Sequence, residues 1–412
     1  MKSLSRERKD EPLGSEQAKV APGGRLGKSA VICAAAFFGS MAGTGALLGV
    51  VFFAREALRA TPTQIGWLGA VWSLSYTFGC VLLRPLMQRL RPRYSMLGAT
   101  AVLGLAILAI PLGRSIGATF ALYTVAGLAL SFFWSPAMGW LSTNVEGPGL
   151  SRAMGRFNLS WSIGEMIGPA MAGCLSEVHV ALPIYVGGGI YLLTALGLLA
   201  AILTLPRLSE GDAAHDSLLE NGGGLDQSTP VRFPAWIGVF AAFLLFGVLN
   251  SIFPLSAVED LHLAKRAVGA LLFVFILALA IGLGATGRTH FWHFRAGWIV
   301  AGTVALAGVA ACFVPARSVA LLVVVLSLAG LLMGWCYANS QFHAVSGSTH
   351  RTSRALINEA LVAGGGIGGA GFGGMLYHRL GMPIVWAACA GFLFLSALAQ
   401  TAAVAIQARN RK

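Results

Sequence analysis

Charged side chains are scarce in this chain. Only 11% of its 412 residues are Asp, Glu, Lys or Arg, whereas 56% are hydrophobic. A soluble globule needs far more polar surface, so this composition excludes one and predicts a chain that is surrounded largely by lipid. Apolar runs of about 20 residues, the length that spans a bilayer as a helix, recur along the sequence. Because these runs show no alternation of apolar and polar residues, they predict helices rather than the strands of a barrel.

The chain also lacks the sequence patterns of enzymes and metalloproteins. It contains no Walker loop and no HExxH or GxSxG pattern, which argues against an ATP-driven pump and against a membrane enzyme. Its six cysteines fall in apolar stretches without CxxC or other metal-type spacing. We therefore expect no catalytic residue, metal, cofactor or disulfide.

The apolar runs predict an all-α membrane protein of twelve transmembrane helices, built as two pseudo-symmetric six-helix bundles. The spans are expected at 29–54, 65–83, 94–112, 118–141, 157–175 and 184–205, and then at 233–255, 267–285, 296–314, 319–342, 355–376 and 383–406. The predicted domains are a basic tail (1–28), an N-terminal bundle (29–205), a polar linker (206–232), a C-terminal bundle (233–406) and a short tail (407–412).

The positions of the basic residues predict the orientation. The net charge is +13, and 22 of the 29 Lys and Arg residues fall in the two tails and in the loops on the same side as the tails. The positive-inside rule then places both termini in the cytoplasm of a multi-pass protein of the cell (inner) membrane. Membrane topology accounts for this distribution of basic residues, so we expect no nucleic acid as a partner. The expected partners are the lipid bilayer and a small-molecule substrate, and the protein is expected to be a monomer.

A repeat links the two halves of the chain. Ala126-Gly127-Leu128 in the fourth span matches Ala329-Gly330-Leu331 in the tenth. The fifth span matches the eleventh at a spacing of 200 residues, with Asn158, Gly164, Gly168 and Gly173 recurring as Asn358, Gly364, Gly368 and Gly373. Equal spacing in neighbouring spans favours two related halves, which is how many transporters build one central site.

The fifth span carries the most specific motif. Gly155, Gly164, Gly168, Pro169 and Gly173 match the antiporter motif of the major facilitator superfamily, with Ala172 in place of one glycine. The chain therefore resembles this family over nearly its whole length, which implies a twelve-helix transporter fold. Small residues permit a close approach of a neighbouring helix, and the proline bends the span.

The loop between the second and third spans resembles the loop signature of the same family, GxxxDxxGRR, in a degraded form. Gln88 stands at the acidic position and only Arg93 keeps its charge in place. The resemblance implies that both residues act with the glycine motif in conformational change. The arginine motif of the family's fourth span is absent, because 118–141 contains no Arg.

Two acids, Glu165 and Glu359, are the only charged residues inside the predicted spans. A charge that faces lipid at a helix centre costs about 2.5 to 3.5 kcal/mol, so both should face a cavity or a partner. Glu165 is expected to carry a proton or to balance a cationic substrate. The alternative is a protonated Glu165 that only fixes helix packing. Glu359 lies near the start of its span, where it could stay solvated or stabilise the helix N-terminus.

Uncharged polar and aromatic residues complete the predicted site. The candidates lie on spans that line the central cavity in the similar family: Trp134, Asn158, Trp161, Asn250, Tyr337, Asn339, Gln341 and Asn358. Trp161 lies one turn before Glu165, so both share a helix face with Asn158 nearby. This group suits an amphipathic or cationic solute. The alternative is interhelical packing, with Asn hydrogen-bonding across helices.

These observations predict a secondary active transporter that moves a small organic solute by alternating access, in proton-linked efflux or exchange. One alternative is a symporter or facilitator for a nutrient such as a sugar or an amino acid. Another is a non-transporting membrane receptor that has kept the fold.

Overall fold

The computed structural model describes residues 22–142, 147–204, 229–346 and 351–409, which form fourteen helices and no strand. Twelve helices are long: α1 (Pro22–Glu56), α2 (Pro62–Leu82), α4 (Pro92–Gly113), α5 (Ile116–Ser142), α6 (Gly147–Val178), α7 (Leu182–Thr204), α8 (Arg232–Ser251), α10 (Lys265–Gly287), α11 (Ala296–Cys312), α12 (Val319–Val345), α13 (Arg351–Leu380) and α14 (Met382–Arg409). The other two, α3 (Arg84–Arg89) and α9 (Phe253–Glu259), are short.

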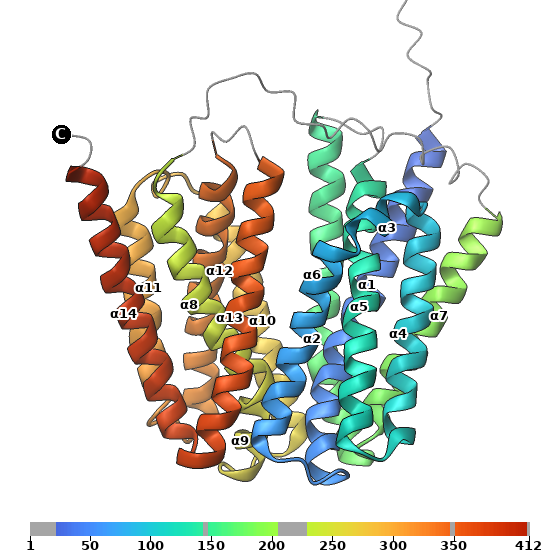
Figure 1. Cartoon of the computed structure of the whole chain (residues 1–412), viewed down its shortest axis with the longest axis horizontal. Helices are drawn as coiled ribbons and strands as arrows, with labels where there is room; N and C mark the ends of the chain where they lie inside the picture. The colour runs from blue at the N-terminus through green and yellow to red at the C-terminus, as the bar shows by residue number, and fades with distance from the viewer. Residues whose placement is uncertain (1–21, 143–146, 205–228, 347–350, 410–412) are drawn as a thin grey trace, which may run out of the picture.

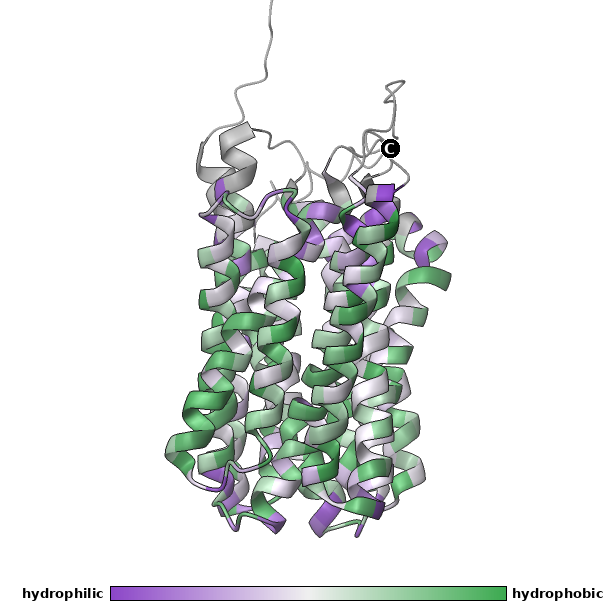
Figure 2. Ribbon diagram, turned by 90° about the vertical axis from the view of Figure 1, so that its left-hand side faces the viewer, coloured by the Kyte–Doolittle hydropathy of each residue, from purple (hydrophilic) through white to green (hydrophobic). Residues whose placement is uncertain are grey.

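The long helices are suited to a bilayer. Ten of them are long and apolar enough to cross a membrane, and α11 is an apolar helix of 17 residues. The twelfth, α6, is less apolar because it contains Arg152, Arg156, Glu165 and Glu177 together with several serines and glycines. Figure 2 shows hydrophobic residues along the middle of the bundle and hydrophilic residues gathered at its two ends. The prediction of an all-helical membrane protein with twelve long helices is confirmed.

The long helices form two sets of six, as predicted, and each set also contains one short helix. One set contains α1 to α7 and the other contains α8 to α14, and Figure 1 shows them side by side. We call the end of the molecule where α1 begins and α14 ends the terminal end, and the opposite end the far end. The two sets come together at the far end and splay apart at the terminal end (Figure 1). Much of the predicted linker and of both tails, at 205–228, 1–21 and 410–412, lies outside the described residues.

Helix packing repeats between the two sets. A Cβ on Gly164 would meet the carbonyl oxygen of Phe37, and a Cβ on Gly365 would meet that of Phe240. Since only glycine permits such an approach of two helix backbones, α6 packs on α1 as α13 packs on α8. The structural repeat of these helices therefore runs at a spacing of 201 residues. This is one residue more than the sequence match to Gly364, whose Cβ would meet only a side chain.

Two helix boundaries correct the predicted spans. The seventh span was expected to run unbroken to Leu255, but α8 ends at Ser251, and α9 begins with Pro254 in its first turn. Proline has no backbone N–H to continue the helix ladder, which accounts for the break. The tenth span was expected to end at Phe342, but α12 continues to Val345 and includes His343, which is fully buried.

Candidate functional site

Glycines join the two halves at the far end. On α2 and α13, a Cβ on Gly66 would meet the backbone of Ala370 and Gly374. On α6 and α10, a Cβ on Gly173 would meet the backbone of Gly269. The two contacts are related by the repeat, since each joins the far end of one glycine-rich helix to the first turns of a helix in the other half. They bring the backbones of the two halves into direct contact and close this end of the molecule.

Two ion pairs lie just beyond these glycines. The Arg55 guanidinium pairs with Glu259, and the Lys265 ammonium lies 2.7 Å from Glu56. In each pair the acid and the base come from different halves. The Tyr377 hydroxyl also donates to Glu259 at 3.3 Å. Salt bridges between solvent-exposed side chains contribute little free energy. The two pairs therefore favour the alignment of the two halves more than they add to the stability of the closed arrangement.

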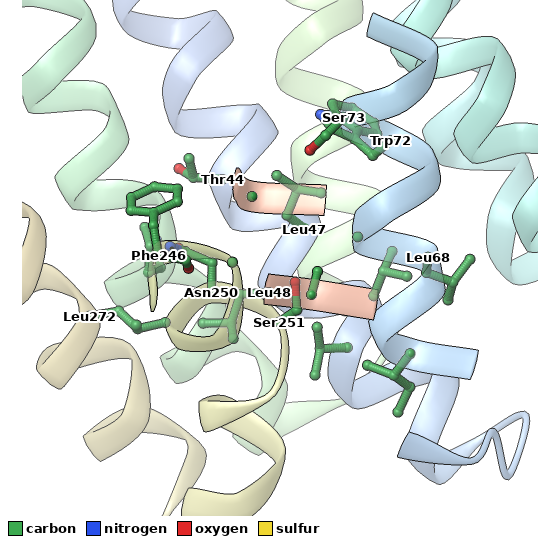
Figure 3. Close-up of a pocket in the computed structure, with 18 of the residues that line it drawn as sticks. Thr44, Leu47, Leu48, Leu68, Trp72, Ser73, Phe246, Asn250, Ser251 and Leu272 are labelled. Carbon is green, nitrogen blue, oxygen red and sulfur yellow. Dashed lines mark hydrogen bonds between the residues drawn. The ribbon is translucent and has the colours of Figure 1, made fainter. Parts of the chain in front are cut away.

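A central pocket of about 150 Å³ lies on the terminal side of the closed layer. Residues of both halves line it, from α1, α2, α5 and α6 on one side and from α8, α10 and α13 on the other. Figure 3 shows Trp72 and Phe246 among the apolar side chains around it, with Thr44 and Asn250 as polar neighbours. An apolar pocket with a few polar groups, set between two halves, is typical of a small-molecule site.

Glu165 and Asn250, both predicted site residues, line this pocket, as does Pro169 of the glycine motif. Among the described residues, the Glu165 carboxyl has no hydrogen-bond or ion-pair partner, although its backbone carbonyl accepts a bond from the Thr44 hydroxyl at 3.3 Å. The Asn250 amide nitrogen donates to the carbonyl of Phe246 at 3.0 Å. Glu165 is therefore free to take a proton or a ligand from the pocket.

Glu359 lies about two helical turns nearer the terminal end than the pocket residues of α13. The Tyr337 hydroxyl donates to its carboxyl at 3.3 Å, and the Asn358 amide donates to it at 3.4 Å. Gln341 also hydrogen-bonds to it, and Ser340 donates to Asn358. Three predicted site residues of the C-terminal half, Tyr337, Gln341 and Asn358, are thus brought together around the fourth, Glu359.

The two acids belong to one central space. Tyr337 is within electrostatic range of both Glu165 and Glu359. Tyr76 and Cys80 of α2 hydrogen-bond to each other, and both are within electrostatic range of Glu359. The Glu359 group therefore lies within electrostatic range of Glu165, through Tyr337, and does not itself line the pocket.

Trp134, Asn158 and Trp161 form a separate group in the N-terminal half. The indole N–H of Trp161 donates to the Asn158 side-chain oxygen at 3.2 Å, and the rings of Trp134 and Trp161 meet edge to face at 6.4 Å. None of the three lines the pocket around Glu165. The structure thus separates Trp161 from the pocket despite its position one turn before Glu165.

Asn339 points into the C-terminal bundle, away from the pocket. It is 1% exposed, its amide nitrogen donates to the carbonyl of Trp335 at 2.9 Å, and its side-chain oxygen is buried without a hydrogen-bond partner. His343, one turn further along α12, is surrounded by the rings of Trp292, Phe294 and Phe342. These residues belong to the packing of α10, α11 and α12.

Some residues of the glycine motif and the loop signature pack against neighbouring helices, and others do not. Gly164 and Gly168 lie against α1, and Gly173 lies against α10, whereas Gly155 has nothing near its Cβ position. Arg93 is buried in the first turn of α4 and contacts the ring of Tyr94. The side chain of Gln88 lies outside the part of the structure that is described.

Sequence analysis missed Trp72, Tyr76 and Cys80. All three lie on α2 at intervals of four residues, so they form one stripe on the helix. Trp72 lines the pocket, and Tyr76 and Cys80 are within electrostatic range of Glu359. The interval itself is visible in the sequence and could have identified them. In the described residues, no group of three His, Cys, Asp or Glu side chains could hold a metal ion.

Comparisons with known proteins identify the fold. The family model of the Major Facilitator Superfamily matches residues 32–227. A mutant of the nucleoside transporter NupG superimposes with a TM-score of 0.75 at 14% identity, covering 91% of this chain and 99% of that one. A bacterial homolog of the human lysosomal transporter Spinster, inward-facing and unoccupied, gives 0.68 at 13%, with 94% and 96% covered. No curated protein matches the chain.

Proposed function

Since this chain is a major facilitator superfamily protein by its fold and by the sequence of its first half, we propose that it is a secondary active transporter. It moves a small organic solute across the cell membrane by alternating access, in proton-linked efflux or exchange. It works as a monomer, because one chain supplies both sides of the central pocket. The observation that carries this proposal is the Glu165 carboxyl, which faces a pocket between the two halves without a protein partner.

The orientation follows from the basic residues. The positive-inside rule assigns the terminal end to the cytoplasm of a cell (inner) membrane, since 22 of the 29 Lys and Arg residues fall in the tails and loops that the sequence predicts on that side. The closed far end then faces outward, and the arrangement is inward-facing. The Glu359 group lies on the cytoplasmic side of Glu165, so a solute from the cytoplasm would meet the two acids in turn.

Glu165 is the coupling group in this proposal. A carboxyl in an apolar pocket can hold a proton or balance a bound positive charge, and it holds only one of them at a time. Solute binding on one side therefore releases the proton there. Once the halves have rocked to open the other end, a new proton displaces the solute. Exchange of one for the other gives efflux driven by the proton gradient.

A nutrient symporter is the second candidate. The nucleoside transporter of similar fold favours it, together with the amide of Asn250 and the ring of Trp72 in the pocket. The direction in which a proton gradient drives solute separates the two candidates. Symport accumulates solute on the side to which protons flow, and exchange accumulates it on the opposite side.

The test is transport by the purified protein in proteoliposomes with an imposed pH gradient. Solutes for the assay are those that raise the melting temperature of the protein. The wild type should move the solute against its concentration gradient only while the pH gradient lasts. Glu165→Gln should lose gradient-driven accumulation and keep, at most, downhill exchange.

Glu177→Gln is the matched control, because Glu177 lies on the same helix but at the far end and outside the pocket, and glutamine keeps a side-chain oxygen to accept the hydrogen bond that the Arg266 backbone N–H donates to Glu177 at 3.2 Å. It should transport as the wild type does. Gradient-driven transport by Glu165→Gln at the wild-type rate would remove the coupling role. A solute that binds but is never moved, in either direction, would favour a receptor that has kept the fold.

A further inference from the structure

The hydroxyl, amide and carboxyl side chains of the central pocket all have an oxygen that can accept a hydrogen bond from a ligand. The Thr44 hydroxyl donates to the carbonyl of Ser40 at 2.9 Å, and the Asn250 nitrogen donates to a backbone carbonyl, so each offers a ligand its oxygen. Glu165 adds a carboxylate without a partner. Ser73, Ser251 and Tyr123 supply hydroxyls that can donate or accept. In the described part of the chain, no Lys, Arg or His lines the pocket. A ligand that donates hydrogen bonds fits this lining best.

The charge of the central space points in the same direction. Glu165 comes from the N-terminal half and Glu359 from the C-terminal half. Glu359 accepts a hydrogen bond from Tyr337 at 3.3 Å, and Tyr337 is also within electrostatic range of Glu165. Glu359 already accepts bonds from Tyr337 and Asn358, so it is held in place at the approach to the pocket. Two acids along one path favour a cation and repel an anion.

The size of the pocket limits the apolar part of the ligand. Its volume is about 150 Å³, and a dry apolar cavity of about this volume in another protein holds one benzene molecule. Leu48, Leu68, Trp72, Phe246 and Leu272 form much of its wall. Figure 3 shows these apolar side chains arranged around the space from both halves. The pocket therefore accommodates one ring or a branched alkyl group of similar size.

From acceptors, charge and size together, we infer that the central pocket binds a protonated primary or secondary amine with a single ring-sized apolar group. The ammonium donates to Glu165 and to the oxygens of Asn250 and Thr44, and the ring occupies the apolar pocket. Glu359 attracts the cation at the approach and does not touch its ring. This inference rests on the proposed function, because it names the solute class that such a transporter would carry.

The test is isothermal titration calorimetry on the purified full-length protein in detergent at neutral pH. The probes are benzylammonium, cyclohexylammonium and phenethylammonium. Benzyl alcohol, benzoate and benzyltrimethylammonium are the matched neutral, anionic and donor-free cationic compounds. The ring-sized amines should bind, and benzyl alcohol and benzoate should bind at least about tenfold more weakly, since benzyl alcohol lacks the positive charge that pairs with Glu165 and benzoate carries the same charge as Glu165. Benzyltrimethylammonium should fall between benzylammonium and benzyl alcohol.

Substitutions of single acids identify the carboxyl group that binds the ammonium group. Glu165→Gln should weaken benzylammonium at least about tenfold and leave benzyl alcohol unchanged, while Glu177→Gln should leave both unchanged. The comparison of compounds uses the wild-type chain, so it does not depend on the folding of any variant. The inference is overturned if none of the three amines binds, or if benzyl alcohol or benzoate binds as tightly as benzylammonium.

The same compounds separate this inference from the proposed function. Benzylammonium that binds through Glu165 but is never transported in proteoliposomes overturns the transport proposal and supports the amine site. A neutral or acidic solute that is transported in a Glu165-dependent manner, without binding of any amine, supports the transporter and overturns the amine site.

Discussion

At the scale of residues, the two acids of the central space have different surroundings. Glu359 is held by the Tyr337 hydroxyl and by the neighbouring Asn358 amide. Glu165 has no such partner among the described residues and faces the pocket. A carboxylate whose hydrogen bonds are already made has less to gain from a ligand than one that has none. Glu165 is therefore the group that exchanges ligands in this account, and Glu359 sets the charge of the path.

The ion pair between Arg55 and Glu259 allows a prediction by charge reversal. Arg55→Glu should lower the melting temperature, because it places a third acid beside Glu56 and Glu259. Glu259→Arg alone should do the same, beside Arg55 and Lys265. The double reversal should recover part of the loss, with a coupling of about 0.2–1 kcal/mol. Thermal unfolding of the four proteins in detergent measures this coupling, and additive losses would show that the pair does not join the halves.

The sequence identified some site residues and could not identify others. Glu165 and Glu359 were found because an acid in an apolar span has to avoid lipid. The arrangement of Tyr337, Gln341 and Asn358 around Glu359 depends on how α12 meets α13, which spacing along one helix does not determine. Trp161 shares a helix face with Glu165, but ring contacts with Trp134 occupy it instead. Spacing predicts which residues share a face and leaves open what that face meets.

At the scale of helices, glycine decides which backbones can touch. Gly164 and Gly168 bring α6 against α1, and Gly365 and Gly369 bring α13 against α8. At each position a Cβ would run into a backbone carbonyl of the neighbouring helix. In lipid, where apolar burial does not drive helices together, contacts this close carry much of the packing energy.

A pair of glycine variants tests this packing. Gly164→Ala should destabilise the protein by about 1–3 kcal/mol, because the new methyl group forces α6 away from Phe37 of α1. Gly155→Ala, on the same helix with open space around it, should be neutral or stabilising by up to about 1 kcal/mol. Melting temperatures in one detergent provide the comparison. Equal effects of the two substitutions would mean that α6 and α1 are not in close contact.

The number of long helices followed from hydropathy, but their ends and breaks did not. A window of apolar residues does not register Pro254, which separates α9 from α8 within one apolar run. It also ended α12 too early, because His343 is polar in the sequence although aromatic rings bury it in the structure. Matching the two halves by identical glycines placed the structural repeat one residue off. Positions 364 and 365 are both glycine, and only Gly365 contacts the backbone of the neighbouring helix.

At the scale of the whole molecule, two similar bundles meet through one layer of glycines at the far end. The resemblance of the glycine motif predicted this fold, and the packing of α6 and α13 shows the same two-fold relation. The state of the molecule could not be predicted, since under the proposed alternating access one sequence supports both an inward-facing and an outward-facing arrangement. In a transporter, weak exposed ion pairs and small residues permit the closed end to open again.

Distances between spin labels at both ends of the molecule test the central claim, that the two halves rock around the Glu165 pocket. One pair of labels replaces Leu90 and Phe294, in loops near the terminal end, and the other replaces Arg114 and Arg317, in loops at the far end. A change from low to high pH, or addition of a transported solute, should redistribute the populations, so that one distance shortens while the other lengthens. Solute transport with both distances unchanged, or with both changing in the same direction, would contradict the account.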